Sequence, residues 1–481
     1  MSERVNEIRK TDEAEKAENP LAAERVGKLI AKFAIPAIIS MLVSSLYNIV
    51  DQIFIGQGVG MLGNAATNIA FPISIICTAT ALMLGIGGAS NYNLESGAGN
   101  KEKASRIAGA GLSMLVICGT VIAAAVLLFL DPLLKIFGVT PEVLPYAQDY
   151  TGITAYGIPF LILTTGGNHL IRADRSPTYS MTCMLTGAIL NTILDLLFIF
   201  GFHLGIKGAA WATVIGQAVS GALVILYFLR FRKMELSWDM LRPKRSCLRA
   251  IASLGMASCI NQIAMAAVQI TMNNTLRHYG AASMYGTDIP LACVGVISKV
   301  NMVFMAICIG ISQGCQPIWG FNYGAGRYAR VRETYGKAFR LVLAVGITFC
   351  LCFQFFPRQL VGIFGTGSEE YFHFAERYFR IFMLMTFTNG IQPMSSGFFT
   401  SIGKARLGIL VSLTRQVIFL LPLILIFPVF MGIDGVMYAG PIADGAALLA
   451  AVICAVRELQ KMKALEREST DEGTNADRVH D

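Results

Sequence analysis

The sequence predicts an all-α polytopic membrane protein, with twelve transmembrane helices in two pseudo-symmetric six-helix lobes. Three observations predict this class. Hydrophobic residues make up 54% of the 481 residues and charged residues only 15%, whereas a soluble domain has about 25% charged residues. Apolar runs long enough to cross a bilayer recur along the whole chain, and the two halves of the chain resemble each other.

The apolar runs define the expected helices. A helix that spans a bilayer needs about 20 mainly apolar residues. The runs that meet this requirement are 28–55, 64–92, 105–130, 146–170, 178–201, 207–230, 248–277, 287–316, 336–356, 370–399, 407–430 and 435–457.

The internal repeat appears in two distant pairs of segments. LGIKGAAWATVIGQ aligns with MGIDGVMYAGPIAD, which sets Gly208 opposite Gly435, and SGAGNKEKA aligns with YGAGRYARV, which sets Gly97 opposite Gly324. Both pairs are 227 positions apart. Each half holds six expected helices, so both halves enter the membrane from the same side. Parallel repeats of this kind are typical of secondary transporters, whose substrate site lies between the halves near the midplane.

Lysine and arginine are concentrated in alternate loops, and this bias marks the cytoplasmic side. We therefore expect a multi-pass protein of the inner (cytoplasmic) membrane with both termini in the cytoplasm. The predicted parts are a cytoplasmic N-terminal tail at 1–26, an N-lobe at 27–230, a basic cytoplasmic linker at 231–247, a C-lobe at 248–458 and a cytoplasmic C-terminal tail at 459–481.

Several classes of function lack the residues they need. The chain has no Walker A lysine loop, no HExxH and no GxSxG, and its eleven cysteines form no CxxC pair. These observations argue against an enzyme, a resident metal and a bound cofactor. The net charge of +8 lies in short loops between apolar runs, so it reflects membrane topology rather than nucleic-acid binding.

One carboxylate stands out inside an apolar run, NTILDLLFIFG. An ionised aspartate at the bilayer centre costs roughly 2.5–3.5 kcal/mol on insertion scales, and intramembrane acids usually have a function. Asn191 is four residues before Asp195, so both lie on one helix face. The next helix offers Thr213 and Gln217, again four residues apart.

The first helix carries a second acid, Asp51, with Tyr47 four residues before it. A carboxylate held out of water can exchange a proton or hold a cation, and one group that does either is the minimum requirement for antiport. The alternative is structural: Asp195 would be a satisfied hydrogen-bonding group, and Asp51 would lie in the headgroup zone.

The second half offers a different set of polar residues, Lys299, Arg415 and Asp444. They could form structural ion pairs or line a substrate cavity. Met265 and Met302 could line an adaptable cavity as well, although methionines in membrane helices more often face lipid or the core.

The residues resemble those of the MATE (multidrug and toxic compound extrusion) family, and of its bacterial MepA/DinF-like branch in particular. The similarity covers about residues 25–460. It is carried by IPAIISMLVSSLYNIVDQIFIGQ, NTILDLLFIFGFHLGIKGAAWAT, GISQGCQPIWGFNYGAGRYARVRE and LTRQVIFLLPLILIFP.

This resemblance implies export of organic-cation or amphipathic drugs in exchange for protons or Na⁺. It also implies a cation-coupling network of Asp51, Asn191, Asp195 and Thr213, with Na⁺ possible at the two aspartates. The sequence departs from the family pattern in two places. Leu196 stands where proline often follows the aspartate, and SCINQIAMAAVQIT lacks the acid that some relatives carry in helix 7. The second departure favours protons.

We therefore expect a proton-coupled antiporter that works by alternating access, with the lipid bilayer and small-molecule drugs as its partners. A two-lobed chain can work as a monomer. The main alternative is a flippase for lipid-linked or polar lipid substrates, in which Lys299 and Arg415 would hold an anionic group. A non-transporting sensor or scaffold and a membrane enzyme are further alternatives with less in the sequence to support them.

Overall fold

The computed structural model describes residues 19–286, 288–363 and 368–478. Within these ranges every regular element is a helix. The elements of the first half are α2 (Pro20–Ala23), α3 (Val26–Gly58), α4 (Met61–Gly97), α5 (Lys101–Leu128), α6 (Leu130–Ile136), α7 (Leu144–Ala155), α8 (Ile158–Ala173), α9 (Pro177–Asp195), the π-helical turn η1 (Leu196–Gly201), α10 (Gly205–Leu226) and a second π-helical turn, η2 (Tyr227–Phe231).

A short 3₁₀ turn, η3 (Trp238–Leu241), lies in the linker between the halves. The elements of the second half are α11 (Arg245–Ala281), α12 (Asp288–Gly324), α13 (Tyr328–Phe355), α14 (Pro357–Gly362), α15 (Glu369–Phe382), α16 (Thr386–Asn389), α17 (Ile391–Ser401), α18 (Ala405–Leu413), the π-helical turn η4 (Thr414–Leu420), α19 (Leu421–Met431) and α20 (Ile433–Arg478).

The predicted fold class is confirmed. Ten helices in the described ranges are long and apolar enough to cross a membrane. The other two expected spans, 146–170 and 370–399, are present but interrupted: the first breaks between α7 and α8, and the second breaks twice, between α15, α16 and α17. The last helix, α20, continues to Arg478, well beyond the span expected for it.

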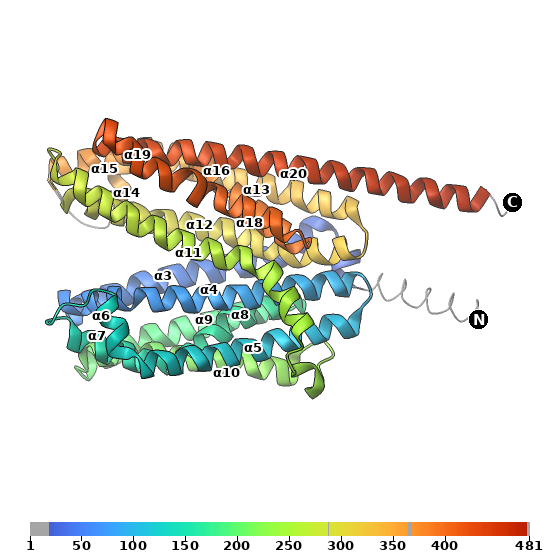
Figure 1. Cartoon of the computed structure of the whole chain (residues 1–481), viewed down its shortest axis with the longest axis horizontal. Helices are drawn as coiled ribbons and strands as arrows, with labels where there is room; N and C mark the ends of the chain where they lie inside the picture. The colour runs from blue at the N-terminus through green and yellow to red at the C-terminus, as the bar shows by residue number, and fades with distance from the viewer. Residues whose placement is uncertain (1–18, 287, 364–367, 479–481) are drawn as a thin grey trace.

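Figure 1 shows the two halves as two bundles that lie side by side, with the first and last described helices reaching the same end of the molecule. The hydrophobic core of each lobe includes residues from the segment that leads into the other lobe. The core of the second half includes α2 and the first turns of α3, from Leu21 to Ala34. The core of the first half includes Cys247 and Ile251 at the start of α11. The first helix of each lobe therefore begins inside the opposite lobe.

The repeated glycine motifs meet where the lobes touch. A Cβ atom on Gly97 would overlap the carbonyl oxygen of Phe321, and one on Gly324 would overlap the carbonyl oxygen of Leu94. Leu94 and Phe321 are themselves 227 positions apart, so the two contacts are related by the repeat. Only glycine allows helices to approach this closely, and the motifs thus close the basic end of the molecule.

The short segment before α3 docks on the second lobe. The side-chain amide of Asn322 donates to the carbonyl oxygen of Leu21 at 3.0 Å, and the Arg330 guanidinium donates to the carbonyl oxygen of Glu24 at 2.7 Å. These bonds tie α2 to the ends of α12 and α13, because free carbonyls at a helix end need donors.

The linker before α11 docks on the first lobe in the corresponding way. The Ser113 hydroxyl donates to the carbonyl oxygen of Leu241 at 2.6 Å, and the backbone N–H of Lys233 donates to Asp174 Oδ2 at 2.6 Å. Each lobe is thus held at its basic end by the chain segment that leads into the other lobe's first helix.

Candidate functional site

Asp195 is the last residue of α9 and is fully buried. The helix changes there from α to π, since η1 begins at Leu196. Turns of this kind insert an extra residue and are frequent at functional sites. Leu196 keeps a backbone N–H that proline would lack, and this N–H donates to the carbonyl oxygens of Thr192 and Ile193.

Asn191 lies between Asp195 and the next helix. In the amide orientation that satisfies both of its groups, Nδ2 donates to Asp195 Oδ2 at 3.2 Å and Oδ1 accepts from the backbone N–H of Thr213 at 3.3 Å. The expected proximity of Asn191, Asp195 and Thr213 is therefore observed. Asn191 is also buried, so its amide links α9 to α10 away from bulk solvent.

Asp51 on α3 lies within hydrogen-bonding reach of Asp195. Asp51 Oδ1 and Asp195 Oδ1 are buried and have no hydrogen-bond partner in the described part of the chain. Two carboxylates this close repel each other when both are ionised. The pair is therefore a site that favours one added positive charge, either a proton shared between the two groups or a cation.

Two tyrosines lie close enough to both carboxylates to interact with them electrostatically. Tyr47 on α3 was expected from the sequence, because it is one turn before Asp51. Tyr150 on α7 was not expected. The available signal was a tyrosine within an apolar run. It is distant in sequence from both acids, and the packing of α7 against α4 and α10 brings it near them.

A small cavity with both polar and apolar lining adjoins this group. Its volume is about 100 Å³, and four of the expected residues line it: Tyr47, Asn191, Thr213 and Gln217. The other lining residues are Ser44, Leu161, Thr164, Thr165, Met184, Gly187, Ala188, Gly216 and Ser220. A drug-sized ligand needs about 300–1,000 Å³, so this cavity has room for a few waters or part of a ligand.

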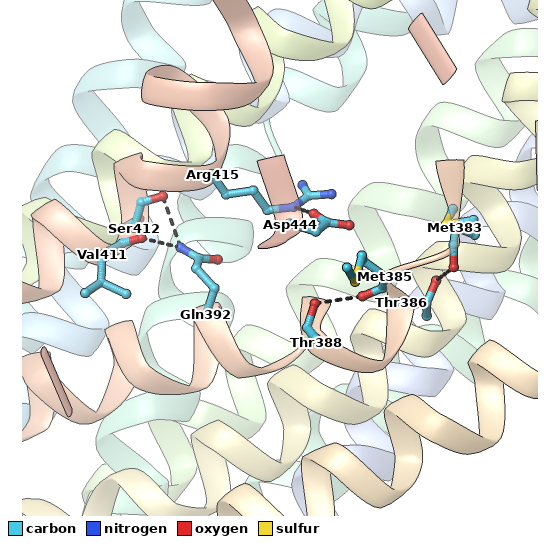
Figure 2. A network of polar contacts seen from close by, with 9 residues as sticks. All are labelled: Met383, Met385, Thr386, Thr388, Gln392, Val411, Ser412, Arg415 and Asp444. Carbon is cyan, nitrogen blue, oxygen red and sulfur yellow. Dashed lines mark hydrogen bonds and ion pairs between the residues drawn. The ribbon is translucent and has the colours of Figure 1, made fainter. Parts of the chain in front are cut away.

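The second lobe treats its buried acid differently. Arg415 Nε donates to Asp444 Oδ1 at 2.5 Å, and the two side chains are only 13% and 3% exposed. Figure 2 shows the pair bridging η4 and α20. Asp444 was expected as a substrate-cavity residue. The structure instead pairs it with Arg415, which agrees with the alternative of a structural ion pair.

Next to this pair, Gln392 caps the start of the second lobe's π turn. Its Nε2 donates to the carbonyl oxygens of Val411 at 2.7 Å and of Ser412 at 3.1 Å, immediately before η4 (Figure 2). A change from α to π geometry takes carbonyls out of the regular helical pattern. The Gln392 amide supplies donors for them.

The remaining expected cavity residues lie on the two long helices that begin the second lobe. Lys299 on α12 is half-buried and has no ion-pair partner in the described ranges. Met265 on α11 is 43% exposed and Met302 on α12 is 41% exposed. The structure does not bring these three residues to the first-lobe cavity.

A helical membrane protein with a parallel internal repeat and a polar group inside one lobe has the architecture of a secondary transporter. The comparison with protein families agrees. The MatE family profile matches residues 36–197 and 257–426, and the chain belongs to this family.

Similar proteins are known at both the sequence and the structure level. The chain is 24% identical over 432 residues to the multidrug export protein MepA of Staphylococcus aureus, covering 89% of this chain and 93% of MepA. A MOP-superfamily transporter from Pyrococcus furiosus superposes with a TM-score of 0.85 at 22% identity, over 92% of this chain and 98% of that chain. An outward-facing multidrug resistance MATE transporter gives the same score and identity over 93% and 98%.

Proposed function

We propose that this protein is a proton-coupled antiporter that exports organic-cation or amphipathic drugs across the cytoplasmic membrane by alternating access. The observation that carries the proposal is the pair of adjacent carboxylates, the partly buried Asp51 and the buried Asp195, together with Asn191, which connects Asp195 to Thr213. The name of the similar MepA protein, a multidrug exporter, supports drugs as the substrate class.

In the proposed cycle the pair exchanges a proton for a cationic drug. With the site open to the outside, Asp195 takes up a proton, the pair loses its attraction for the drug cation, and the drug leaves. With the site open to the cytoplasm, the proton leaves and the negative pair attracts another cation. Asn191 and Thr213 hold the Asp195 carboxyl in place, and Tyr47 and Gln217 face the cavity where part of the drug would lie.

The contacts between the lobes support a state that is open to the outside. Among the described glycines, the close approaches across the lobes involve the half of the molecule near the basic loops, as at Gly97 and Gly324. We place this end in the cytoplasm by the positive-inside rule, which also places both termini there. Because one chain supplies both lobes, we expect the monomer to be active.

The flippase alternative has less support in the second lobe. A pyrophosphate or phosphate headgroup would need basic groups that are available to it, and the charge of Arg415 is already balanced by Asp444. The flippase alternative also needed Lys299 to hold the anionic group, and Lys299 lies on α12, whereas Arg415 lies in η4. Sodium in place of the proton is the closer competitor, because a carboxylate pair accepts either.

The test is ethidium transport in proteoliposomes with an imposed pH gradient and no sodium. Exchange of one proton for one monovalent cation moves no net charge, so each pH unit should support about tenfold accumulation. Wild type should transport, and Asp195→Asn should not. Asp149→Asn is the matched control, because Asp149 is a partly exposed acid of the same lobe, paired with Lys207.

The outcomes separate the alternatives. Transport that needs sodium rather than a pH gradient would keep the carboxylate site but replace the coupling ion. Equal transport by wild type and Asp195→Asn would contradict the proposed role of Asp195. No transport by wild type under either gradient would contradict the drug-export proposal for ethidium and favour the flippase.

A further inference from the structure

A second and larger cavity lies at the basic end, where the two lobes meet. Its volume is about 360 Å³. It is enclosed by the end of α4, the turn after α8, the linker, the segment around α2, and Phe321 on α12. The walls therefore come from both lobes and from the two segments that dock on them. The cavity is complete only while the lobes are closed at this end.

Positive charge exceeds negative charge around this cavity. Arg175, Lys233 and Lys101 line it, and Glu235 is the acidic residue that lines it within the described chain. Lys233 Nζ donates to the carbonyl oxygen of Arg175 at 2.9 Å. The guanidinium of Arg175 itself makes no hydrogen bond or ion pair to any part of the chain that the structure describes.

The backbone holds Arg175 in an unusual conformation. Its φ of +61° lies in the left-handed region, which is uncommon for a residue other than glycine, asparagine or aspartate. The turn is fixed by Asp174, whose Oδ2 accepts from the Lys233 N–H at 2.6 Å and from the Tyr227 hydroxyl at 2.7 Å. Strained residues that their surroundings hold in place are frequent at ligand sites.

The titration of two groups around the turn fits this arrangement. Burial raises the pKa of the Asp174 carboxyl, and the bonds from Lys233 and Tyr227 oppose that change. Burial and the nearby Arg175 charge lower the pKa of Lys233. Both causes disfavour the charged form of Lys233: burial removes water from the ammonium group, and the Arg175 charge repels it.

Two buried polar side chains face the cavity without partners. Asn93 is 3% exposed and Ser105 is 4% exposed, and both line the cavity. Neither side chain makes a hydrogen bond to any described residue. Both side chains are open to the cavity, so they offer a donor and acceptors to whatever the cavity contains.

We propose that this cavity binds a phosphate-bearing anion. The Arg175 guanidinium, the Lys233 ammonium, an amide and a hydroxyl line it from different sides, which suits a tetrahedral oxyanion with several acceptor oxygens. The volume corresponds to about a dozen waters, which is more than inorganic phosphate fills. The ligand is therefore a diphosphate or a phosphate ester, either free in solution or carried as a lipid headgroup.

An occupant would bridge the two lobes. It would touch Arg175 and Asn93 of the first lobe while lying against Leu21 and Phe321, which belong to the core of the second. Its binding would favour the state that is closed at the basic end. This effect on transport rests on the proposed alternating access, whereas the binding itself does not.

The test is isothermal titration of sodium pyrophosphate into the purified full-length protein in dodecyl maltoside, a detergent without phosphate. Arg175→Gln should weaken binding about tenfold or more, as expected for loss of a charge-assisted hydrogen bond. Asn93→Leu should weaken binding too, and it removes no side-chain hydrogen bond within the described part of the chain. Arg249→Gln is the matched control, because Arg249 is an exposed arginine near the same end that does not line the cavity.

A second arm identifies the source of the phosphate. Phosphatidylglycerol added to the micelles should displace pyrophosphate if the ligand is a lipid headgroup, whereas diacylglycerol should not; no displacement by either lipid assigns a soluble ligand. The proposal is overturned if wild type binds neither probe, or if Arg175→Gln and Asn93→Leu bind as Arg249→Gln does. Thermal unfolding without any probe checks that each variant is folded, and no drug transport is needed.

Discussion

The two lobes differ in how they neutralise their buried acids. In the first lobe, Asp51 and Asp195 lie against each other, and each has a buried oxygen without a partner in the described ranges. In the second lobe, Asp444 is paired with Arg415. A buried acid with a fixed cation partner has little reason to bind another positive charge, whereas two adjacent acids do. This asymmetry is why we place ion coupling in the first lobe.

The ion pair of the second lobe should be sensitive to loss of one partner. Asp444→Asn should lower the free energy of unfolding by roughly 3–5 kcal/mol, because it leaves the Arg415 charge buried and unpaired. The double variant Arg415→Met/Asp444→Leu should recover most of that loss. Denaturant titration in detergent measures both.

The control is Asp434→Asn. Asp434 pairs with Arg377 at 2.7 Å, and the side chains are 30% and 41% exposed. Exposed pairs of this kind contribute about 0–1 kcal/mol. Equal losses at Asp444 and Asp434 would contradict the view that burial makes the difference.

At the scale of elements, a π turn interrupts the equivalent helix in each lobe, η1 after α9 and η4 after α18. In the first lobe η1 follows directly after Asp195, and in the second lobe η4 contains Arg415. The buried charge of each lobe therefore lies where the helix departs from regular α geometry. In the second lobe, the amide of Gln392 on α17 caps the residues that precede the turn.

Removing this cap should destabilise the second lobe. Gln392→Leu leaves the carbonyl oxygens of Val411 and Ser412 without their donor in a buried site, which costs about 1–3 kcal/mol. The thermal unfolding temperature in detergent should fall accordingly. Gln354→Leu removes a similar bond, 3.1 Å to the carbonyl oxygen of Arg380, at an exposed position. Water replaces that bond, and an equal fall for Gln354→Leu would argue against the capping role.

For the whole molecule, the repeat has a physical use at the interface between the lobes. The glycine motifs that identify the repeat in the sequence are the places where α4 and α12 touch each other's backbone. Duplication of one close contact produces a symmetric closure at the basic end, and separation of the lobes would open both contacts together. The same closure encloses the cavity around Arg175.

A single methyl group should disturb this closure. Gly97→Ala places a Cβ against the carbonyl oxygen of Phe321, so the lobes cannot approach as closely. We expect faster amide hydrogen exchange in the ends of α4 and α12 than in wild type. Gly336→Ala is the control, because a Cβ there meets open space and alanine favours a helix by about 1 kcal/mol. Unchanged exchange in Gly97→Ala would contradict a closure set by these glycines.

Much of the fold follows from the sequence by itself. Length and apolarity determine which segments enter the membrane, because burial of a helix in lipid depends on its own residues. The 227-residue repeat predicted the two lobes, and the four-residue spacing placed Asn191 beside Asp195. These features are local or periodic, so no tertiary contact is needed to see them.

The family resemblance grouped Asp51 with Asp195, but the residue pattern by itself does not say which charges meet, and the tertiary structure decided this. Asp51 and Asp195 are 144 positions apart, Arg415 and Asp444 lie on different elements, and Tyr150 reaches the acids through the packing of α7. The π turn that begins at Leu196 and the cavity around Arg175 likewise depend on neighbouring segments. The physical reason is that apolar patterning determines that a helix is buried but not its rotation or partner, and those are selected by the packing of all helices together.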